Sequence, residues 1–211
     1  MPRKKQILIT AGNTREMIDP VRYLSNVSTG VMGYELARAS HGAGYPTVLI
    51  SGPTALKPPR GVRFIPIMSS HELEHALKKY FPKCDVLFMT SAVCDFRPVK
   101  FSKGKIKRRD FFNLKLEKTT DILKEIAQQK GKRVVVGFCL ETDNLLANAR
   151  QKLSDKKIDY IVANFLGRGS MPFGDHRTSV TLLGKDGQTL SLKNASKSKV
   201  AKFLFETVVA R

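Results

Sequence analysis

The sequence predicts an α/β protein with an open, mainly parallel sheet and helices on both faces. Short apolar runs alternate with amphipathic segments along most of the chain, as they do in repeated strand–helix units. The run "DVLFMTSAV" at 85–93 is apolar nearly throughout, which is typical of a strand covered on both faces. Near the C-terminus, two alternating runs flank a Lys-Asp-Gly turn and predict a β-hairpin at about 178–193.

The expected elements follow one another in a regular order. A strand at 6–10 ends in the turn "AGNT", and a helix at 29–44 closes at two glycines. The other strands are expected at 46–52, 62–67, 85–93, 133–138 and 159–164, and the other helices at 69–81, 119–132, 143–157 and 196–210. The stretch 94–112 is expected to be a loop. Ligands of such sheets bind at the carboxyl ends of strands, so we expect the chemistry in 11–30, 51–60, 91–109, 138–144 and 164–178.

The size and the cysteines of the chain narrow the class of protein. Its 211 residues predict one domain spanning 1–211. No apolar run approaches the roughly 20 residues of a membrane span. The first residues, "MPRKKQILIT", lack the apolar core of a signal peptide, so a cytoplasmic location is expected. Cys84, Cys94 and Cys139 form no C-x-x-C pair, which argues against a disulfide framework or a zinc ribbon.

The net charge of +19 predicts an anionic partner, either nucleic acid or a phosphorylated small molecule. The positive residues are spread along the chain rather than gathered in a tail. The densest run, "KGKIKRR" at 103–109, lies between two structured segments and has no aromatic pairs of the kind that single-strand binders use. A nucleic-acid partner is therefore the less favoured of the two.

Residues 71–75, "HELEH", match the zinc-binding pattern H-E-x-x-H. Ser69 and Glu72 form a capping box, which places His71 in the first turn of the helix at 69–81. His71 and His75 would project away from the apolar stripe of that helix, which comprises Leu73, Ala76, Leu77 and Tyr80. No third ligand follows at a metalloprotease spacing. The pattern therefore predicts a solvated helix face, not a zinc site.

The segment after the first strand has features of a phosphate site. Gly12 lies in the turn, Ser28-Thr29-Gly30 opens the next helix, and Gly33 follows one turn in. Backbone N–H groups at a helix N-terminus bind phosphate, although Ser or Thr before Gly is also an ordinary helix cap. The chain contains neither G-x-G-x-x-G nor G-x-x-x-x-G-K-[ST], so the dinucleotide and P-loop fingerprints are absent.

A set of longer motifs occurs in a fixed order from about residue 6 to 205: "ITAGNTREMIDPVRYLSNVSTGVMGYELA", "SGPT", "SAVCDFRP", "KIKR", "TTDIL", "VGFCLET", "ARQKL" and "DYIVAN". Together they resemble the phosphopantothenate–cysteine ligase family. The resemblance implies a Rossmann-like sheet and the joining of 4′-phosphopantothenate to cysteine through an acyl-nucleotidylate. It also implies CTP or ATP as co-substrate with Mg²⁺, and a homodimer. We expect the terminal hairpin to form part of the dimer contact. No flavin decarboxylase domain is recognised, so no FMN is expected.

The resemblance also implies roles for individual residues. Arg22 and Asn26 match residues that hold phosphopantothenate, and Asn26 also contacts the acyl intermediate. Lys105 matches the catalytic lysine of a mobile flap at about 96–112, and Asp95 matches a residue of the nucleotide and metal site. Ser91 and Ala92 line the substrate pocket. The remaining nucleotide-site matches are Gly12, Ser28, Gly30, Gly33, Met89, Thr90, Ser91, Thr120, Asp121, Ile122, Leu123, Phe138, Lys152, Lys156 and Asn164.

Some positions depart from the usual motifs. Thr90-Ser91 and Cys94 replace alanines, Thr120 stands where proline is common, and "VGFCLET" replaces VGFAAET. These changes lie near the expected nucleotide, so they leave the choice between CTP and ATP open. Two other functions remain alternatives: a basic nucleic-acid-binding protein on a nucleotide-binding scaffold, and an inactive relative of the ligase.

Overall fold

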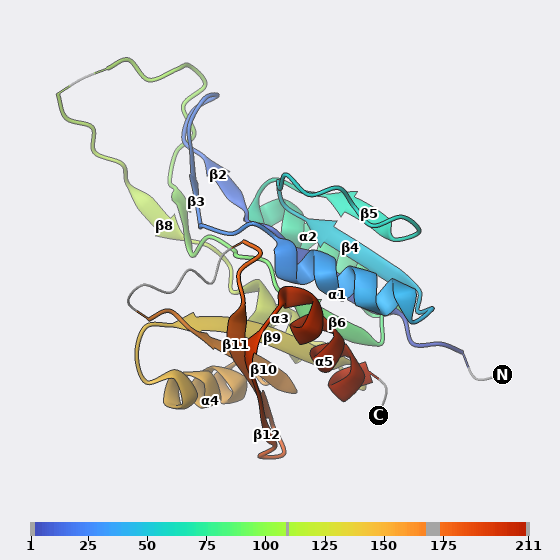
Figure 1. Ribbon diagram of the computed structural model, residues 1–211. Coiled ribbons are helices and arrows are strands. Elements are labelled where there is room, and N and C mark those ends of the chain that lie inside the picture. Colours follow the sequence, from blue (N-terminus) through green and yellow to red (C-terminus); the bar gives the residue numbers. More distant parts are fainter. Residues whose placement is uncertain (1–2, 109, 168–173, 210–211) are drawn as a thin grey trace.

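The computed structural model describes residues 3–108, 110–167 and 174–209, and it has an eight-stranded sheet at its centre (Figure 1). The strand order is β12-β11-β10-β9-β6-β1-β4-β5. The strands are β1 (Ile7–Ala11), β4 (Thr47–Ser51), β5 (Arg63–Pro66), β6 (Val86–Met89), β9 (Val134–Glu141), β10 (Tyr160–Phe165), β11 (Thr178–Gly184) and β12 (Thr189–Ala195). All neighbours pair in parallel except β10 with β11 and β11 with β12. The predicted fold class and terminal hairpin are confirmed.

Helices cover both faces of the sheet and divide its core into two layers. On one face lie α1 (Val31–Gly42) and α5 (Lys197–Val209), which pack against each other (Figure 1). The other face carries α2 (Ser70–Tyr80), α3 (Ile122–Gln128) and α4 (Leu145–Asp155). Neighbouring residues of β1 serve opposite layers, because Leu8 packs with α2 and α3 whereas Ile7 and Ile9 pack with α1 and α5.

The chain order reverses direction between β1 and β6. From β1 the chain moves outward through β4 to β5, then crosses back so that β6 lies on the other side of β1. In open parallel sheets such a reversal leaves a crevice at the carboxyl ends of the two central strands. The segments after β1 and β6 therefore meet at this point.

Two small antiparallel pairs extend beyond the sheet. β2 (Arg15–Met17) pairs with β3 (Tyr23–Ser25), and β7 (Phe96–Pro98) pairs with β8 (Leu116–Lys118). We call these two pairs, together with the loop 99–115, the arm. The arm projects at the upper left of Figure 1. The expectation of a loop throughout 94–112 was wrong at β7. Its partner β8 lies beyond a long loop, so no local alternation indicated the pairing. Arg109, in the predicted flap, lies outside the described residues.

Helix α2 carries the "HELEH" pattern on its exposed side. Ser69 Oγ accepts a hydrogen bond from Glu72 N at 3.2 Å, and Glu72 Oε2 accepts one from Met68 N at 2.8 Å. The helix start is therefore capped as predicted, with Glu72 reaching one residue further back than the usual capping box. His71 and His75 are both exposed, whereas Leu73 and Leu77 are fully buried. In the described residues no helix is long and apolar enough to cross a membrane.

Candidate functional site

The turns after β1 and β6 are joined by several hydrogen bonds. Ala92 N donates to Gly12 O at 2.8 Å, and Thr14 N donates to Ala92 O at 3.2 Å. Ser91 N donates to Thr10 Oγ1 at 3.1 Å, and Thr90 Oγ1 donates to Thr10 O at 2.5 Å. These bonds hold Gly12, Thr90, Ser91 and Ala92 together at the strand-order reversal. The sequence predicted all four as site residues.

Helix α1 approaches this rim closely because its first turn is rich in glycine. A Cβ on Gly33 would lie 2.5 Å from Ala11 Cβ and 2.6 Å from Thr90 Oγ1. Gly30 adopts the left-handed conformation, with φ 78°, and precedes the helix without a side-chain cap. The N-terminus of α1 thus rests directly on β1, and among the described residues no side chain caps its first N–H groups. A small cavity of about 70 Å³ lies there, lined by Ser28, Thr29, Gly30, Val31, Met32, Gly33, Thr90, Gly174 and Lys197.

Among the described residues, Lys197 is the cation that lines this small cavity, and sequence reasoning missed it. It is the first residue of α5 and is only 5% exposed. Burial lowers the pKa of its ammonium group, and the negative charge of nearby Asp175 raises this pKa by a smaller amount. Nothing in the local sequence distinguishes Lys197 from the many other lysines, because its position depends on how α5 packs against α1.

A larger cavity of about 400 Å³, the carboxyl-end cavity, opens beyond β6 and β9. It is lined by Met89, Ser91, Val93, Asp95, Phe96, Lys118, Thr119, Thr120, Asp121, Ile122, Leu123, Phe138 and Lys156. Nine of these were predicted nucleotide-site residues: Met89, Ser91, Asp95, Thr120, Asp121, Ile122, Leu123, Phe138 and Lys156. They come from four separate segments of the sequence, and the fold brings them to one hollow.

The charged groups of the carboxyl-end cavity are of both signs. Lys156 Nζ contacts both carboxylate oxygens of Asp121, at 2.7 and 2.6 Å. Asp121 Oδ1 also accepts a hydrogen bond from Lys124 N at 3.1 Å and so caps α3. Asp95 and Lys118 are exposed in the same hollow. A polyanion entering this cavity would therefore meet two lysines, one of which would have to exchange its carboxylate for the ligand.

The segment before Asp95 is held rigidly by buried hydrogen bonds. Cys94 N donates to Thr14 Oγ1 at 3.0 Å, and Thr119 Oγ1 donates to Cys94 O at 2.5 Å. Thr119 N donates to Asp95 O at 2.9 Å. Burial raises the pKa of the Cys94 thiol, so this cysteine serves as a packing residue rather than a nucleophile. The Asp95 carboxylate is thus presented from a fixed backbone.

Asn26 lies at the entrance to this region. Its side-chain amide donates to Val93 O at 2.8 Å, and its backbone oxygen accepts a hydrogen bond from Asn13 Nδ2 at 2.9 Å. Val93 lines the carboxyl-end cavity and is two residues from Asp95. The structure therefore brings Asn26 beside the cavity, as the predicted substrate role requires.

Arg22 contacts the arm next to Lys105, and neither residue lines the two cavities described above. Arg22 Nη1 donates to Asp19 Oδ2 at 2.9 Å and to Ile106 O at 3.2 Å. Ile106 N donates to the same Asp19 oxygen at 3.1 Å. Burial raises the pKa of Asp19, but the N–H groups of Val21, Ile106 and Arg22 and the Arg22 charge outweigh it and lower the pKa. Lys105 is exposed next to this anchor.

Two other predicted nucleotide residues make contacts elsewhere. Lys152 Nζ pairs with Glu141 Oε1 at 2.6 Å, on the strand that carries Phe138. Asn164 Nδ2 donates to Thr178 Oγ1 at 3.0 Å and joins β10 to β11. Like Arg22 and Lys105, these residues line neither cavity.

The lining residues that sequence reasoning missed are Val93, Phe96, Lys118 and Thr119. Phe96 and Lys118 face each other as register partners of β7 and β8. Their place in the cavity follows from the pairing of two three-residue strands, which has no local sequence signal. In the described part of the chain, no group of three or more His, Cys, Asp or Glu side chains is placed to hold a metal ion.

The fold and its rim define an α/β protein whose candidate ligand site lies at the strand-order reversal of a mainly parallel sheet. A family model described as "DNA/pantothenate metabolism flavoprotein C-terminal domain" matches residues 3–211, and the chain belongs to this family. It is 40% identical over 208 residues to the coenzyme A biosynthesis bifunctional protein CoaBC of Bacillus subtilis, covering 98% of this chain and 51% of that protein. The chain thus spans about half the length of the curated relatives it matches.

Solved structures agree with this family assignment. The C-terminal domain of a coenzyme A biosynthesis bifunctional protein CoaBC is similar with a TM-score of 0.83 and 35% identity, covering 98% of this chain and 94% of that one. A DNA/pantothenate metabolism flavoprotein from Streptococcus pneumoniae is similar with a TM-score of 0.85 and 26% identity, covering 98% and 99%.

Proposed function

We propose that this chain joins 4′-phosphopantothenate to cysteine at the expense of a nucleoside triphosphate. The observation that carries the proposal is the gathering of nine family-matched nucleotide residues in the carboxyl-end cavity, with Asn26 at its edge. The 40% identity to a coenzyme A biosynthesis protein over nearly the whole chain supports the same reaction. The phosphate-bearing substrate and co-substrate also agree with the net charge of +19.

The proposed reaction has two steps. A carboxylate oxygen of phosphopantothenate attacks the α-phosphorus of the triphosphate, the bond to the β-phosphate breaks, and pyrophosphate leaves. The amine nitrogen of cysteine then attacks the acyl carbon, the bond to the nucleotide oxygen breaks, and the nucleoside monophosphate leaves while the amine loses a proton. Both steps place extra negative charge on phosphate oxygens, which fixed cations stabilise.

The residues of the rim have distinct proposed roles. The base would lie against Phe138, and the phosphates would meet Lys156 and Lys118. The N–H groups at the start of α1 suit a further phosphate group. Asn26 would orient the carboxylate of phosphopantothenate and Arg22 would bind its phosphate end. Lys105, on the arm, would close over the reacting phosphate and exclude water.

Asp95 is the proposed holder of Mg²⁺. Its carboxylate is exposed in the carboxyl-end cavity, and the other carboxylate there, Asp121, is paired with Lys156. Mg²⁺ is commonly bound by one or two carboxylates together with substrate phosphates, so a single free carboxylate fits the ion. When bound, Mg²⁺ would neutralise charge on the triphosphate.

A homodimer is part of the proposal, and the arm is the surface that best supports it. Exposed large apolar side chains concentrate on or beside the arm: Met17, Val21, Tyr23, Val27, Phe96, Val99, Phe101, Phe111, Phe112 and Leu116. Patches of this kind mark protein interfaces. The terminal hairpin, predicted as part of the contact, has no large hydrophobic residue among the exposed ones. Sedimentation velocity should give a dimer, and Phe101→Ser with Phe112→Ser should shift it to monomer.

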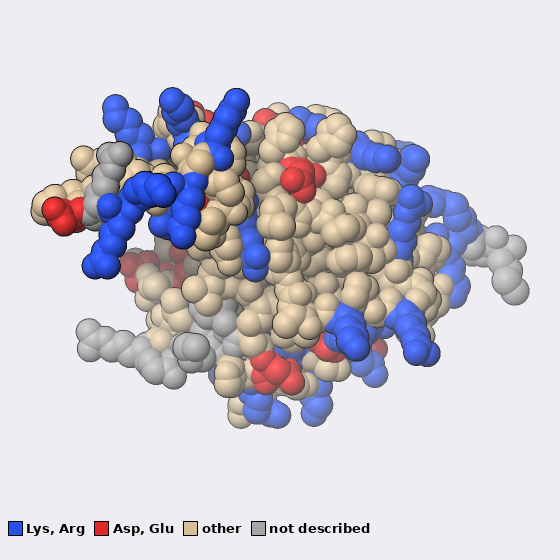
Figure 2. Space-filling view, turned by 90° about the horizontal axis from the view of Figure 1, so that it is seen from above, with Lys and Arg blue, Asp and Glu red and all other residues tan. Residues whose placement is uncertain are grey.

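A nucleic-acid-binding function remains the alternative. Figure 2 shows Lys and Arg side chains most densely at the left, over the end that carries the arm, and further ones along the right side and the lower edge, around a central area free of them. The arm contributes Lys100, Lys103, Lys105, Lys107 and Arg108, all exposed. A cluster of cations beside the proposed active site is suited to binding a triphosphate. A nucleic-acid duplex would need a continuous stripe of cations instead.

One assay tests the proposal. The protein is incubated with phosphopantothenate, cysteine and either CTP or ATP, and pyrophosphate, monophosphate and the amide product are followed. We expect the amide product only when all three substrates are present, with one pyrophosphate released for each product molecule. The triphosphate that gives the faster product formation is the preferred one. No product with either nucleotide, together with tight salt-sensitive binding of DNA or RNA, would favour the alternative. A cytoplasmic location also remains a prediction from the sequence.

A further inference from the structure

The β2–β3 hairpin and the loop 99–115 are joined at one buried carboxylate, that of Asp19. Its side chain is 0% exposed, although Asp19 lies in the turn of a hairpin that extends beyond the sheet. In Figure 1 the blue turn between β2 and β3 lies beside the green loop of the arm. A buried charge needs hydrogen-bond donors from the chain itself, and four hydrogen bonds reach this one.

The two oxygens of Asp19 serve different parts of the molecule. Oδ1 accepts hydrogen bonds from Val21 N and Arg22 N, both at 2.8 Å, and so closes the turn of its own hairpin. An Asp before a proline favours this local turn. Oδ2 accepts from Arg22 Nη1 at 2.9 Å and from Ile106 N at 3.1 Å. The second oxygen therefore reaches across the sequence to the residue that follows Lys105.

Arg22 holds the other side of the same residue. Its Nη1 and Nη2 both donate to Ile106 O at 3.2 Å. Ile106 is thus bound at its N–H by Asp19 and at its C=O by Arg22, while Arg22 is itself paired with Asp19. We call these contacts among the three residues the Asp19 clamp.

The Asp19 clamp is the point at which the loop 99–115 is fixed. Beyond the β7–β8 ladder, the hydrogen bonds that join the described part of this loop to other segments all end on residues 18–22. The remaining one runs from Ser102 N to Ile18 O at 3.0 Å. Lys105 stands next to the clamp with its side chain exposed. Its ammonium group is therefore free to move, but only within reach of a fixed backbone.

We propose that Asp19 is a positioning residue for Lys105: through Ile106 it fixes the backbone from which the lysine reaches the reacting phosphate. This inference rests on the proposed function, in which Lys105 closes over that phosphate. A long loop held only at its ends would have to be ordered during each turnover, which costs conformational entropy. The Asp19 clamp orders the loop beforehand, so the ammonium group is near its place when the substrates bind.

Asp19→Asn tests the clamp at a single oxygen. The amide keeps one oxygen to close the turn, but its NH₂ group cannot accept the hydrogen bonds from Ile106 N and Arg22 Nη1. In the ¹⁵N-labelled wild-type chain, we expect the Ile106 amide hydrogen to exchange with solvent at least about tenfold more slowly than that of Lys107, which has no acceptor among the described residues. Asp19→Asn should remove this difference. The measurement uses NMR and needs no substrate.

The kinetic effect of Asp19→Asn should depend on Lys105. We expect kcat for product formation to fall at least about tenfold, because the lysine is no longer placed in advance. In the Lys105→Gln background the same change should lower kcat by less than about twofold, since a residue that acts through Lys105 has nothing left to position. A merely structural role would give equal factors in both backgrounds. Any lost orientation of Arg22 should raise the KM for phosphopantothenate instead.

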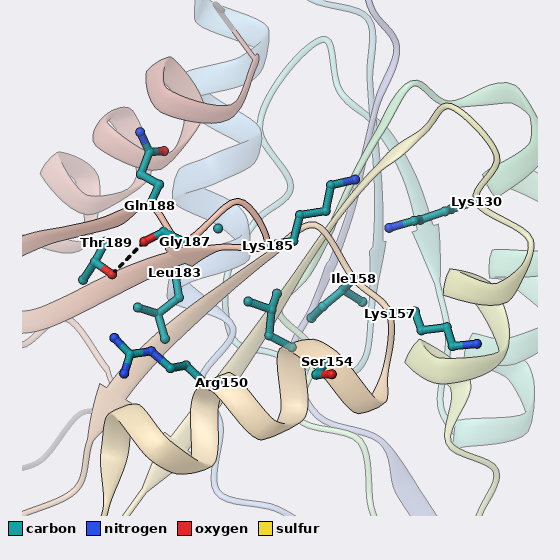
Figure 3. A pocket seen from close by; sticks show the side chains of 12 residues that line it. Lys130, Arg150, Ser154, Lys157, Ile158, Leu183, Lys185, Gly187, Gln188 and Thr189 are labelled. Atoms are coloured by element: carbon teal, nitrogen blue, oxygen red, sulfur yellow. Dashed lines mark hydrogen bonds between the residues drawn. The ribbon is translucent and has the colours of Figure 1, made fainter.

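Asp159→Asn is the matched control, because Asp159 is another buried carboxylate with several donors. Two of its partners, Lys130 and Lys185, lie at 2.9 and 2.6 Å from it and line a cavity beside the end of α4 (Figure 3). This variant should lose stability yet keep the kcat of the wild type.

Ile106→Pro tests the clamp from the side of the loop and serves where Asp19→Asn does not fold. It removes the N–H that donates to Asp19 and leaves the carboxylate in its own turn. We expect its kcat to fall at least about tenfold as well, with the melting temperature close to that of the wild type.

Three results would overturn the proposal in a wild-type protein that forms the product. The first is an Ile106 amide that exchanges as fast as that of Lys107. The second is wild-type kcat in Asp19→Asn or, where that variant does not fold, in Ile106→Pro. The third is an equal loss of kcat from Asp19→Asn with and without Lys105→Gln. A wild-type protein that forms no product would refute the proposed function instead, and the exchange of Ile106 would then decide alone whether the clamp exists.

Discussion

The two ends of the parallel strands differ in the length and chemistry of the segments that join them. At the carboxyl ends, the chain between β1 and α1 covers residues 12–30, and that between β6 and α3 covers 90–121. At the amino ends, α3 and β9 are joined by 129–133 and α4 and β10 by 156–159. Long segments bring exposed polar groups together from distant parts of the sequence, whereas short ones tie helices to strands. The exposed polar groups of the candidate site therefore lie at one end of the sheet, and the short connections that fix helices to strands lie at the other.

The charged residues show the same difference. Asp159, at the amino ends, is buried against two lysines and a backbone N–H group. Asp95 and Lys105, at the carboxyl ends and on the arm, are exposed. A buried carboxylate contributes to folding stability, whereas an exposed one remains available to a ligand. Substitutions at the carboxyl ends should therefore change catalytic rate, and substitutions at the amino ends should change the free energy of unfolding. The following experiments test this division between the two ends.

The largest effect is expected at Lys105. Lys105→Gln should reduce the rate of product formation at least about 100-fold, because it removes a cation from the proposed transition state. Its melting temperature should match that of the wild type, since Lys105 is exposed and Ile106 retains its bonds to Asp19 and Arg22. Steady-state assays and calorimetry measure the two properties. Lys115→Gln, in the same loop, is the control, and equal rates in both variants would refute the role of Lys105.

Gly33→Ala should be an exception, a rim substitution that lowers stability, because Gly33 is packed against Ala11, Thr90 and the backbone of Thr10. The new Cβ would lie 2.5 Å from Ala11 Cβ and 2.9 Å from Thr10 O, so α1 must move away from β1. We expect the free energy of unfolding to fall by about 3 kcal/mol, the upper part of the range for overpacking. Urea denaturation measures it. Gly42→Ala, at the other end of α1 where a Cβ meets nothing within 4 Å, should be neutral or slightly stabilising.

Asp159→Asn should lower stability at the amino ends without changing catalysis. Losing the carboxylate leaves Lys130 and Lys185 without their partner, at a cost of about 2 kcal/mol in the free energy of unfolding. Urea denaturation at neutral pH measures this cost. kcat/KM below the melting transition should be unchanged. Asp110→Asn, exposed on the arm, is the matched control and should leave stability as it is.

The same substitution has a defined pH dependence. Burial raises the pKa of Asp159, but the hydrogen bonds from Lys185, Lys130 and Val135 outweigh it, so the folded pKa is lowered. The ionised carboxylate therefore contributes stability above the unfolded pKa of about 4, and this contribution disappears as the pH falls through the folded pKa. The stability difference between wild type and Asp159→Asn should be constant from pH 5 to 7 and shrink in acid. A difference that grew in acid would contradict this assignment.

The smallest effect is expected on helix α2. His71→Ala and His75→Ala should each change the free energy of unfolding by less than about 0.5 kcal/mol, because both side chains are exposed. Leu73→Ala, between them and fully buried, should cost about 3 kcal/mol. Elemental analysis of the purified protein should find no stoichiometric zinc. Zinc at one equivalent, lost in both histidine variants, would show that the motif binds metal after all.

Parts of this molecule that depend on neighbouring residues in the chain were predictable. The alternation of apolar and amphipathic segments indicated the parallel sheet, and the spacing around Leu73 and Leu77 indicated which side of α2 faces water. Nine of the matched nucleotide residues lie together in the carboxyl-end cavity. Most of them end a strand, follow one or begin a helix, whereas Phe138 lies within β9 and Lys156 follows the end of α4. A residue at the end of a parallel strand reaches this rim wherever the strand lies in the sheet, so predicting the strand or helix correctly was enough to place the residue.

The tertiary structure decided what depends on contacts between distant segments. Phe96 and Lys118 reach the carboxyl-end cavity because β7 pairs with β8, and Lys197 reaches α1 because α5 packs beside it. A further cavity, of about 560 Å³, forms where the end of α4 meets the turn between β11 and β12 (Figure 3). The physical reason is that periodicity determines which face of an element is buried, whereas long-range packing selects the element that covers it.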